Sequence, residues 1–198
     1  MPATKTVTAQ LAAFAIIAAA LGAPLWPERA WDEVPRAQAE LLADDASAVV
    51  AGAAIARSGN HIQLARGFLY AVALEGALKV AETTGLAASG FSVADFLHGP
   101  IAIARPGTSA VAYAAAGPVA DDVREAAARA RDAGAQLITV GAEAGPGEIH
   151  VAVPGDVPEA LAPLVHIVRA QQLALHATLA LGRDPDRPQG LTKVTPTT

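Results

Sequence analysis

The sequence has no cysteine, few aromatic residues and few charges. Of its 198 residues, 17% are charged and 4% are aromatic. Without cysteine the chain has no disulfide, no thiolate nucleophile and no cysteine-based metal site, although this absence does not indicate a compartment. The net charge of −5 is spread along the chain with no block of Lys and Arg. This pattern argues against a nucleic-acid partner, which normally requires a basic surface.

Apolar residues are abundant, at 53% of the chain. Such a composition excludes a disordered chain, and the length is sufficient for one domain with a buried core. Because so few charges are available to cover the surface, we expect a partner to cover part of it. The composition therefore predicts an oligomer or a missing companion domain.

A run without charge, residues 6–27, could be read in three ways. Its alanine content and its Pro24 and Pro27 favour a buried helix over a membrane span, which is normally rich in Leu, Ile, Phe and Val. A signal peptide is the other alternative, but Lys5 alone makes a weak basic segment before the run. We expect a buried helix, no membrane span, and a cytoplasmic protein.

The first 58 residues have a helical pattern throughout. Residues 4–22 predict one helix, ended by Gly22 and the prolines that follow. Residues 30–57 predict one or two further helices, divided near Pro35 and near Asp44 and Asp45. We therefore expect a helical connector, residues 1–58, that packs on the domain that follows.

From residue 59 the pattern changes to strands that alternate with helices. A long helix is predicted after the first strand, an amphipathic one over 119–135, and a final one from Pro158 to Gly182. The predicted strands are 61–65, 89–93, 109–115, 136–142 and 148–153. This alternation predicts an α/β fold, a three-layer α-β-α sandwich with a mainly parallel sheet over residues 59–182. Residues 183–198 form a polar tail, which composition alone would class as a linker.

Three charges share one face of the helix that contains "ALEGALKVAETTG", residues 73–85. At 3.6 residues per turn, Glu75, Lys79 and Glu82 fall within about 60° of one another. They could be surface ion pairs that contribute a few tenths of a kcal/mol, the more common case for this spacing. Alternatively they line a polar cavity, where burial raises a carboxylate pKa towards neutrality and makes it a proton carrier.

Other candidate groups give weaker signals. His98 lies in a loop before Gly99, where a histidine can act as an acid or base but is more often simply exposed. Arg66 and Gly67 lie between a strand and a helix, where free N–H groups favour anions. His166 and His176 are ten residues apart on the last helix, which is not a metal-pair spacing, so we expect core or interface residues. No metal site and no cofactor is predicted.

Three motifs in order carry a family resemblance. "ARGFLYAVALEGALKVAET", "GFSVADFLHGPIAIA" and "RPQGLTKVT" resemble the second, C-terminal half of the double sugar-isomerase (SIS) proteins. These include the isomerase half of glucosamine-6-phosphate synthase and the SIS-type glucosamine-6-phosphate deaminases. The resemblance covers nearly the whole chain and implies the SIS fold and a sugar-phosphate ligand.

The resemblance also implies roles for individual residues. Glu82 matches the base that moves a proton between C1 and C2 of the open-chain sugar. Lys79 matches a lysine of the same site, with Glu75 as its structural partner. His98 matches a histidine that helps to open the sugar ring and reaches the neighbouring subunit's site. Lys193 matches a tail lysine, which makes residues 183–198 an active-site lid; Arg66 and Gly67 are expected at the substrate.

The sequence departs from the family pattern in several places. Ala65, Ala81 and Ser89 replace a Gly, a Lys and a Glu that the family usually has, and these changes put the placement of the substrate in doubt. The Ser/Thr phosphate loops of the first SIS module are absent, which gives the chain the look of a truncated or split protein. We expect half of a sugar-phosphate isomerase or amino-sugar-phosphate deaminase, in a homodimer or with a companion SIS module. The alternative is a non-catalytic phosphosugar-binding or regulatory module.

Overall fold

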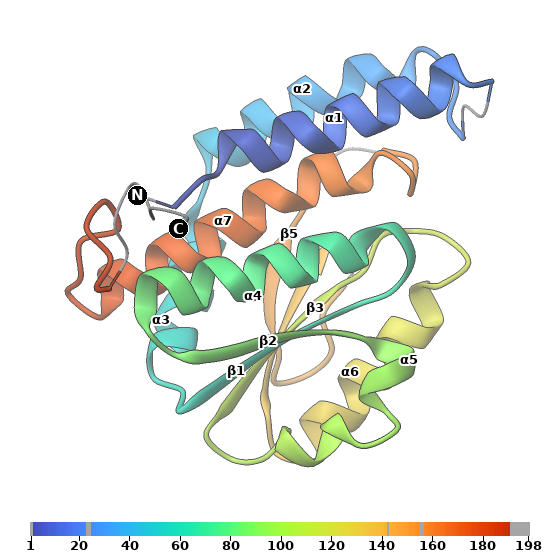
Figure 1. Cartoon of the computed structure of the whole chain (residues 1–198). Coiled ribbons are helices and arrows are strands. Elements are labelled where there is room, and N and C mark those ends of the chain that lie inside the picture. Colours follow the sequence, from blue (N-terminus) through green and yellow to red (C-terminus); the bar gives the residue numbers. More distant parts are fainter. Residues whose placement is uncertain (1, 23–24, 142, 155–156, 191–198) are drawn as a thin grey trace, which may run out of the picture.

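The computed structural model describes residues 2–22, 25–141, 143–154 and 157–190. Within them a single parallel sheet lies between two layers of helices (Figure 1). The strand order is β2-β1-β3-β4-β5, with β1 Asn60–Ala65, β2 Ala87–Ser92, β3 Thr108–Tyr113, β4 Gln136–Gly141 and β5 Ile149–Ala152. The predicted three-layer α-β-α sandwich is therefore confirmed, and each predicted strand is present with ends shifted by at most a few residues.

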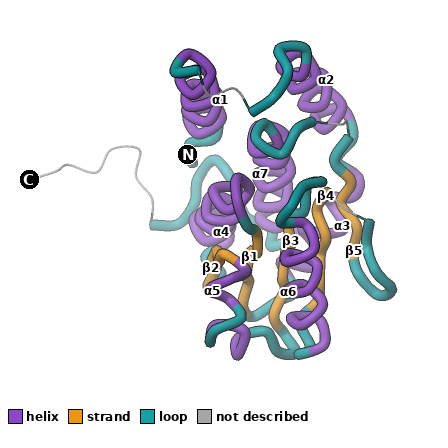
Figure 2. The backbone as a smooth tube through the Cα atoms, turned by 90° about the vertical axis from the view of Figure 1, so that its right-hand side faces the viewer, coloured by secondary structure: helices purple, strands orange, loops and turns teal. Residues whose placement is uncertain are grey.

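The helices divide between the two faces of the sheet (Figure 2). On one face lie α3 Ala46–Ala56, α4 Tyr70–Thr84 and α7 Ala162–Ala180. On the other face lie the short α5 Val93–Phe96 and α6 Ala120–Asp132. Short 3₁₀ turns at Gly67–Leu69 and Pro100–Ile103 complete the elements on this part of the chain.

Alternation along the strands produces one apolar core on each side of the sheet. In β3, Val111 and Tyr113 contact the core under α4 and α7, whereas Ala110 and Ala112 contact the core under α6. Successive side chains of a strand point to opposite faces, so a strand buried on both faces is apolar nearly throughout. This explains why "SAVAYAA" reads as an uninterrupted apolar run.

Two helices at the start of the chain pack outside α7 (Figure 1). They are α1 Lys5–Ala20 and α2 Ala30–Ala43. α1 has no fully buried residue, and Phe14 is 70% exposed, so the expectation of a buried helix was wrong. The predicted break at Asp44 and Asp45 is confirmed, but Pro35 lies inside α2. The helix continues past the proline because Val34, Ala37 and Leu41 bury one apolar face against the core, which offsets the lost hydrogen bond.

One further difference from the sequence-based expectations concerns the start of the last helix. The last helix begins at Ala162 and not at Pro158, because residues 158–161 form a tight turn in which Pro158 O accepts from the N–H of Leu161. None of the helices in the described ranges combines the length and the apolar character that crossing a membrane requires.

Candidate functional site

The predicted charged face of α4 is present as a compact ion-pair cluster. Lys79 Nζ lies 2.6 Å from Glu82 Oε2 and 3.4 Å from Glu75 Oε1. The lysine side chain is only 6% exposed, against 11% for Glu75 and 23% for Glu82. These pairs are therefore not an ordinary surface stripe, because the shared lysine is buried and the two carboxylates differ in their access to solvent.

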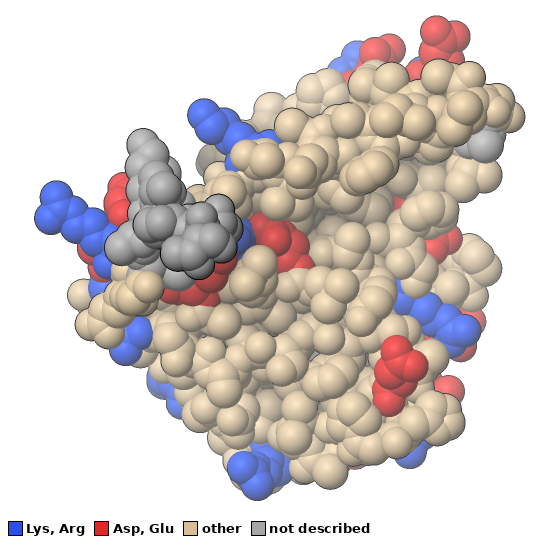
Figure 3. All heavy atoms as spheres, in the orientation of Figure 1, with Lys and Arg blue, Asp and Glu red and all other residues tan. Residues whose placement is uncertain are grey.

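The cluster lies at the border between the buried and the exposed sides of α4. Val72, Val80 and Thr83 are buried against the sheet and α7, whereas Leu74 and Leu78 are 45% and 48% exposed on the neighbouring strip of the helix. Figure 3 shows that this side of the molecule is mostly uncharged, with few Lys, Arg, Asp or Glu atoms. The Glu75–Lys79–Glu82 cluster thus lies at the edge of an apolar surface.

Burial gives Glu75 an unusual electrostatic environment. Desolvation raises the pKa of Glu75, Lys79 opposes that rise, and the nearby Glu82 adds to it. Within the described residues, Glu75 Oε1 has no hydrogen-bond partner, and its distance of 3.4 Å from Lys79 Nζ is an ion-pair contact. One lysine is shared between two carboxylates, so the cluster has an excess negative charge when both are ionised. Such an arrangement can hold or accept a proton.

Gly76 lets α4 approach the sheet closely beneath this cluster. A Cβ atom at Gly76 would collide with the side-chain amide of Gln63, including Nε2 at 3.0 Å. Gln63 comes from β1 and is completely buried. Glycine is unfavourable within a helix, so its presence here has a packing reason. The height of the Glu75–Lys79 turn above the sheet is set by this contact.

Gln63 is itself held by a chain of buried hydrogen bonds. Tyr113 Oη donates to Gln63 Oε1 at 2.8 Å, and Gln63 Nε2 lies 3.0 Å from His61 Nε2. His61 Nδ1 lies 2.8 Å from Ser109 Oγ, which lies 2.9 Å from Ser58 Oγ. An amide nitrogen can only donate, so His61 Nε2 accepts and Nδ1–H donates to the serine. Burial also lowers the pKa of His61 to about 3, so this ring is neutral.

Arg66 and Gly67 lie at the opposite end of α4 from Glu82. At 1.5 Å per residue, the fifteen residue steps from Gly67 to Glu82 span about 22 Å. Arg66 Nη1 pairs with Asp122 at 2.9 Å, and a Cβ atom on Gly67 would lie 3.1 Å from Glu159 Oε1. The predicted anion-binding loop therefore already faces a carboxylate. Its role in substrate binding stays a prediction, and the structure does not bring it together with Glu82.

His98 lies away from the α4 cluster. It follows α5, where its N–H donates to Asp95 O at 3.1 Å, and its side chain is exposed. Since α5 packs on α6 and the edge of the sheet, His98 lies on the other face from α4. A single chain therefore does not assemble Glu82 with His98. Lys193, the third predicted catalytic residue, lies outside the described residues, as do the last residues of the predicted lid.

Sequence reasoning missed the support beneath the cluster. Gln63, Tyr113 and Ser109 were read only as strand residues. His61 and Gln63 of "NHIQLA" are two positions apart and so share one face of the strand, which was the available signal for a buried polar row. His166 and His176 were expected in the core or an interface. His166 is 4% exposed, and His176 Nε2 lies 2.8 Å from Asp45 Oδ2.

Comparison with known proteins identifies the relatives of this chain. No family model matches it. It is 32% identical over 196 residues to the glutamine–fructose-6-phosphate aminotransferase (isomerizing) of Methanothermobacter thermautotrophicus, covering 96% of this chain and 33% of that protein. The chain is similar to the C-terminal double sugar-isomerase (SIS) part of such proteins. It spans about a third of the length of such relatives.

Solved structures agree with this SIS assignment. The C-terminal domain of the glucosamine-fructose-6-phosphate aminotransferase from Francisella tularensis matches with a TM-score of 0.73 at 22% identity, covering 79% of this chain and 45% of that one. The tagatose-6-phosphate ketose/aldose isomerase from Escherichia coli matches with a TM-score of 0.67 at 25% identity, covering 80% and 45%. In both cases the SIS chain matches about half of a larger protein.

Proposed function

We propose that this SIS chain is the C-terminal half of an aldose–ketose sugar-phosphate isomerase or an amino-sugar-phosphate deaminase that acts on hexosamine 6-phosphates. The observation that carries the proposal is the Glu75–Lys79–Glu82 cluster, in which one buried lysine is shared by two carboxylates of unequal exposure. The names of the relatives support this reading and do not favour a non-catalytic binding module. The cytoplasmic location expected from the sequence stays a prediction.

In the proposed reaction Glu82 is the base, because it is the more accessible carboxylate. It removes the proton from C2 of the open-chain aldose, and the C2 electron pair forms a double bond to C1 while O1 becomes an oxyanion. Lys79 stabilises that oxyanion. Return of the proton to C1, with transfer of the O2 proton to O1, gives the ketose. With an amino group on C2 the same steps give an imine, which water hydrolyses to the ketone and ammonia.

The role that we propose for Glu75 differs from that of Glu82. It is more buried, and its ion pair with Lys79 keeps the ammonium directed along the helix face. Desolvation by burial is the largest cause of its raised pKa. We therefore assign Glu75 to positioning Lys79, the role that the family resemblance implied, and not to proton transfer.

The proposed site requires a second wall. Exposed apolar side chains flank the cluster on α4, and others lie on α1 and α7: Phe14, Ile17, Leu74, Leu78, Leu175 and Leu179. The relatives are about three times as long as this chain, and a companion SIS module would supply the phosphate-binding loops that this sequence lacks. His98, exposed and on the far face, would serve the site of a neighbouring subunit in a homodimer.

The test is to combine this chain with the first SIS module of a relative and to supply glucosamine 6-phosphate and fructose 6-phosphate. Sugar interconversion and ammonia release distinguish isomerase from deaminase. Glu82→Gln should reduce turnover by about 100-fold or more while substrate affinity changes little, because an amide cannot accept the proton. Glu125→Gln, on the exposed face of α6, is the matched control. Full turnover by Glu82→Gln would contradict the proposed base.

A further inference from the structure

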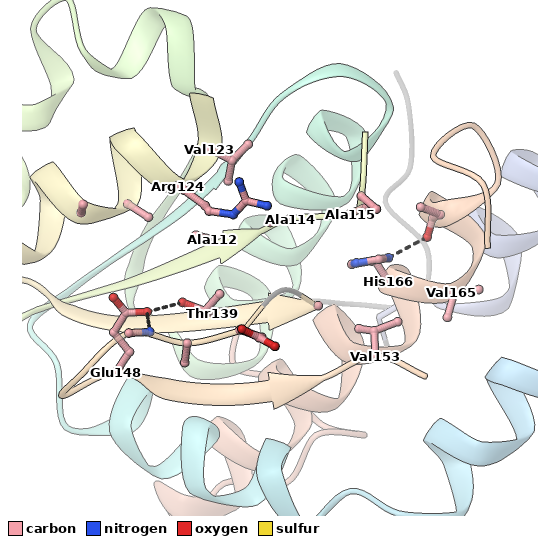
Figure 4. A pocket seen from close by; sticks show the side chains of 18 of the residues that line it. Ala112, Ala114, Ala115, Val123, Arg124, Thr139, Glu148, Val153, Val165 and His166 are labelled. Carbon is pink, nitrogen blue, oxygen red and sulfur yellow. Dashed lines mark hydrogen bonds between the residues drawn. The ribbon is translucent and has the colours of Figure 1, made fainter. Parts of the chain in front are cut away.

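A cavity lies at the carboxyl edge of the sheet, at the ends of β3, β4 and β5 (Figure 4). Its volume is about 790 Å³, within the range of small-molecule sites. α6 forms one side through Val123 and Ala127, and the first turn of α7 forms another. Glu75, Lys79 and Glu82 do not line it, so it is separate from the proposed isomerase wall.

His166 supplies an unused hydrogen-bonding atom to this cavity. Its ring is buried at 4% exposure, and its Nδ1 lies 3.0 Å from Ala162 O. A carbonyl oxygen can only accept, so Nδ1 carries the proton and donates it. Burial lowers the pKa of His166 to about 4, so the ring is neutral near pH 7 and Nε2 keeps a free lone pair. Within the described residues Nε2 has no hydrogen-bond partner.

Gly141 leaves the side of that lone pair free of a side chain. It follows the buried part of β4, and a Cβ atom there would lie 2.8 Å from His166 Nε2. The backbone at Gly141 has φ of 100°, a left-handed value that glycine adopts without strain. In Figure 4 the imidazole reaches from α7 towards the interior of the cavity. The cavity therefore presents a buried acceptor that none of the described residues satisfies, at a position where an unsatisfied group is costly.

The charged side chains around the cavity balance one another. Two arginines, Arg124 and Arg131, and two glutamates, Glu143 and Glu148, line it, which gives no net charge. Glu148 is already satisfied by Arg131 at 2.8 Å, by Thr139 Oγ1 at 2.8 Å and by the N–H of Gly145 at 2.9 Å. Most of the remaining wall is alanine and valine. The lining thus carries no net charge, and one of its two carboxylates is already paired.

We propose that this cavity binds an uncharged small molecule that has an apolar ring face and a hydroxyl or N–H group, which donates to His166 Nε2. The alanine and valine walls contact the ring, and the donor satisfies His166 Nε2, which has no partner among the described residues. A nucleoside is a ligand of this class. The site is independent of the proposed isomerase chemistry, since the two share no lining residue.

The test uses the 198-residue chain labelled with ¹⁵N-histidine. Phenol and uridine are the donor probes, and anisole is a ring of similar shape without a donor. Phenol and uridine should shift the Nε2 resonance of His166, whereas anisole should not. His150, exposed on β5, should stay unchanged and is the internal control. A spectrum in which neither donor probe moves His166, or in which anisole moves it equally, overturns the proposal.

Two variants separate the hydrogen bond from the cavity. His166→Phe keeps a ring but removes the acceptor, and should weaken phenol binding about fivefold to tenfold. Ala128→Leu narrows the cavity from α6 without touching His166, and leucine is well tolerated in a helix. It should abolish the phenol-induced shift. Unchanged phenol binding in Ala128→Leu would mean that phenol binds outside this cavity, and would refute the proposed site.

Discussion

Lys79 and His166 are both buried basic side chains, yet their surroundings are opposite in character. Lys79 lies between two carboxylates, so its charge is compensated by partners on its own helix. His166 has a carbonyl partner and no carboxylate among its described hydrogen-bond partners, and burial keeps it neutral by lowering its pKa to about 4. Compensated charge is suited to moving protons, whereas a neutral acceptor is suited to recognising a donor.

The largest expected effect comes from removing the compensating charge. Lys79→Met leaves Glu75 and Glu82 close together without a cation, and should lower the free energy of unfolding at pH 7 by about 2–4 kcal/mol. Urea denaturation measures this loss. Adding Glu75→Gln in the same chain should restore part of it, because the buried carboxylate is then gone. A loss below about 0.5 kcal/mol would mean that the cluster behaves as an ordinary surface pair.

A smaller effect is expected from the support under the lysine. Gly76→Ala places a Cβ atom against Gln63 and should lower the free energy of unfolding by about 1–3 kcal/mol, although alanine is the better helix former. The double variant with Gln63→Ala should recover stability that Gly76→Ala loses. Ala81→Gly, on the less buried side of the same helix, is the control for helix propensity alone. Stabilisation by Gly76→Ala would disprove the close contact.

A further effect on stability should appear on acidification. The pKa of His61 is lowered from 6.5 to about 3 and that of His166 from 6.5 to about 4, so the stability they contribute is present above pH 6.5. It is lost as the pH falls from 6.5 towards those folded values, by about 1.4 kcal/mol per pH unit for each histidine. Unfolding free energies measured between pH 7.5 and about 4.5 give the slope.

His166→Phe separates the two histidines in that experiment. It should reduce the slope by about 1.4 kcal/mol per pH unit and leave the part due to His61. Glu75 acts with the opposite sign, because its pKa is raised from 4.5 and its contribution is lost as the pH rises through the folded value. An unchanged slope in His166→Phe would show that His166 is not neutral in the folded protein.

Much of the fold could be predicted because the relevant signals are local. Apolar strands, an alternation of strands with helices, and glycine after α4 and α7 each reflect short-range preferences. The interpretation of Pro35 as a helix break was wrong, because burial of the α2 face outweighs the local penalty of proline. Likewise the first residues after Pro158 form a turn and not a helix.

The site could be predicted only in part. The spacing of Glu75, Lys79 and Glu82 placed them on one face, but their burial depends on how α4 meets the sheet. Spacing along the chain could not show that Asp122 and Glu159 already face the Arg66–Gly67 loop, since those contacts cross between elements. For the same reason the sequence could not show that His166 Nε2 has no hydrogen-bond partner among the described residues.

The buried row from Tyr113 to Ser58 has one further consequence, for how the sequence can change over time. Each member donates in the same direction, towards Ile55 O, which accepts from Ser58 Oγ at 2.7 Å. Replacing one member leaves its neighbours without a hydrogen-bond partner, so these positions should change together and not singly. Residue 76 is tied to the same group, since a side chain there requires a smaller residue at position 63. The residues that the "EGALK" segment tolerates at position 76 therefore depend on side chains of β1 and β3.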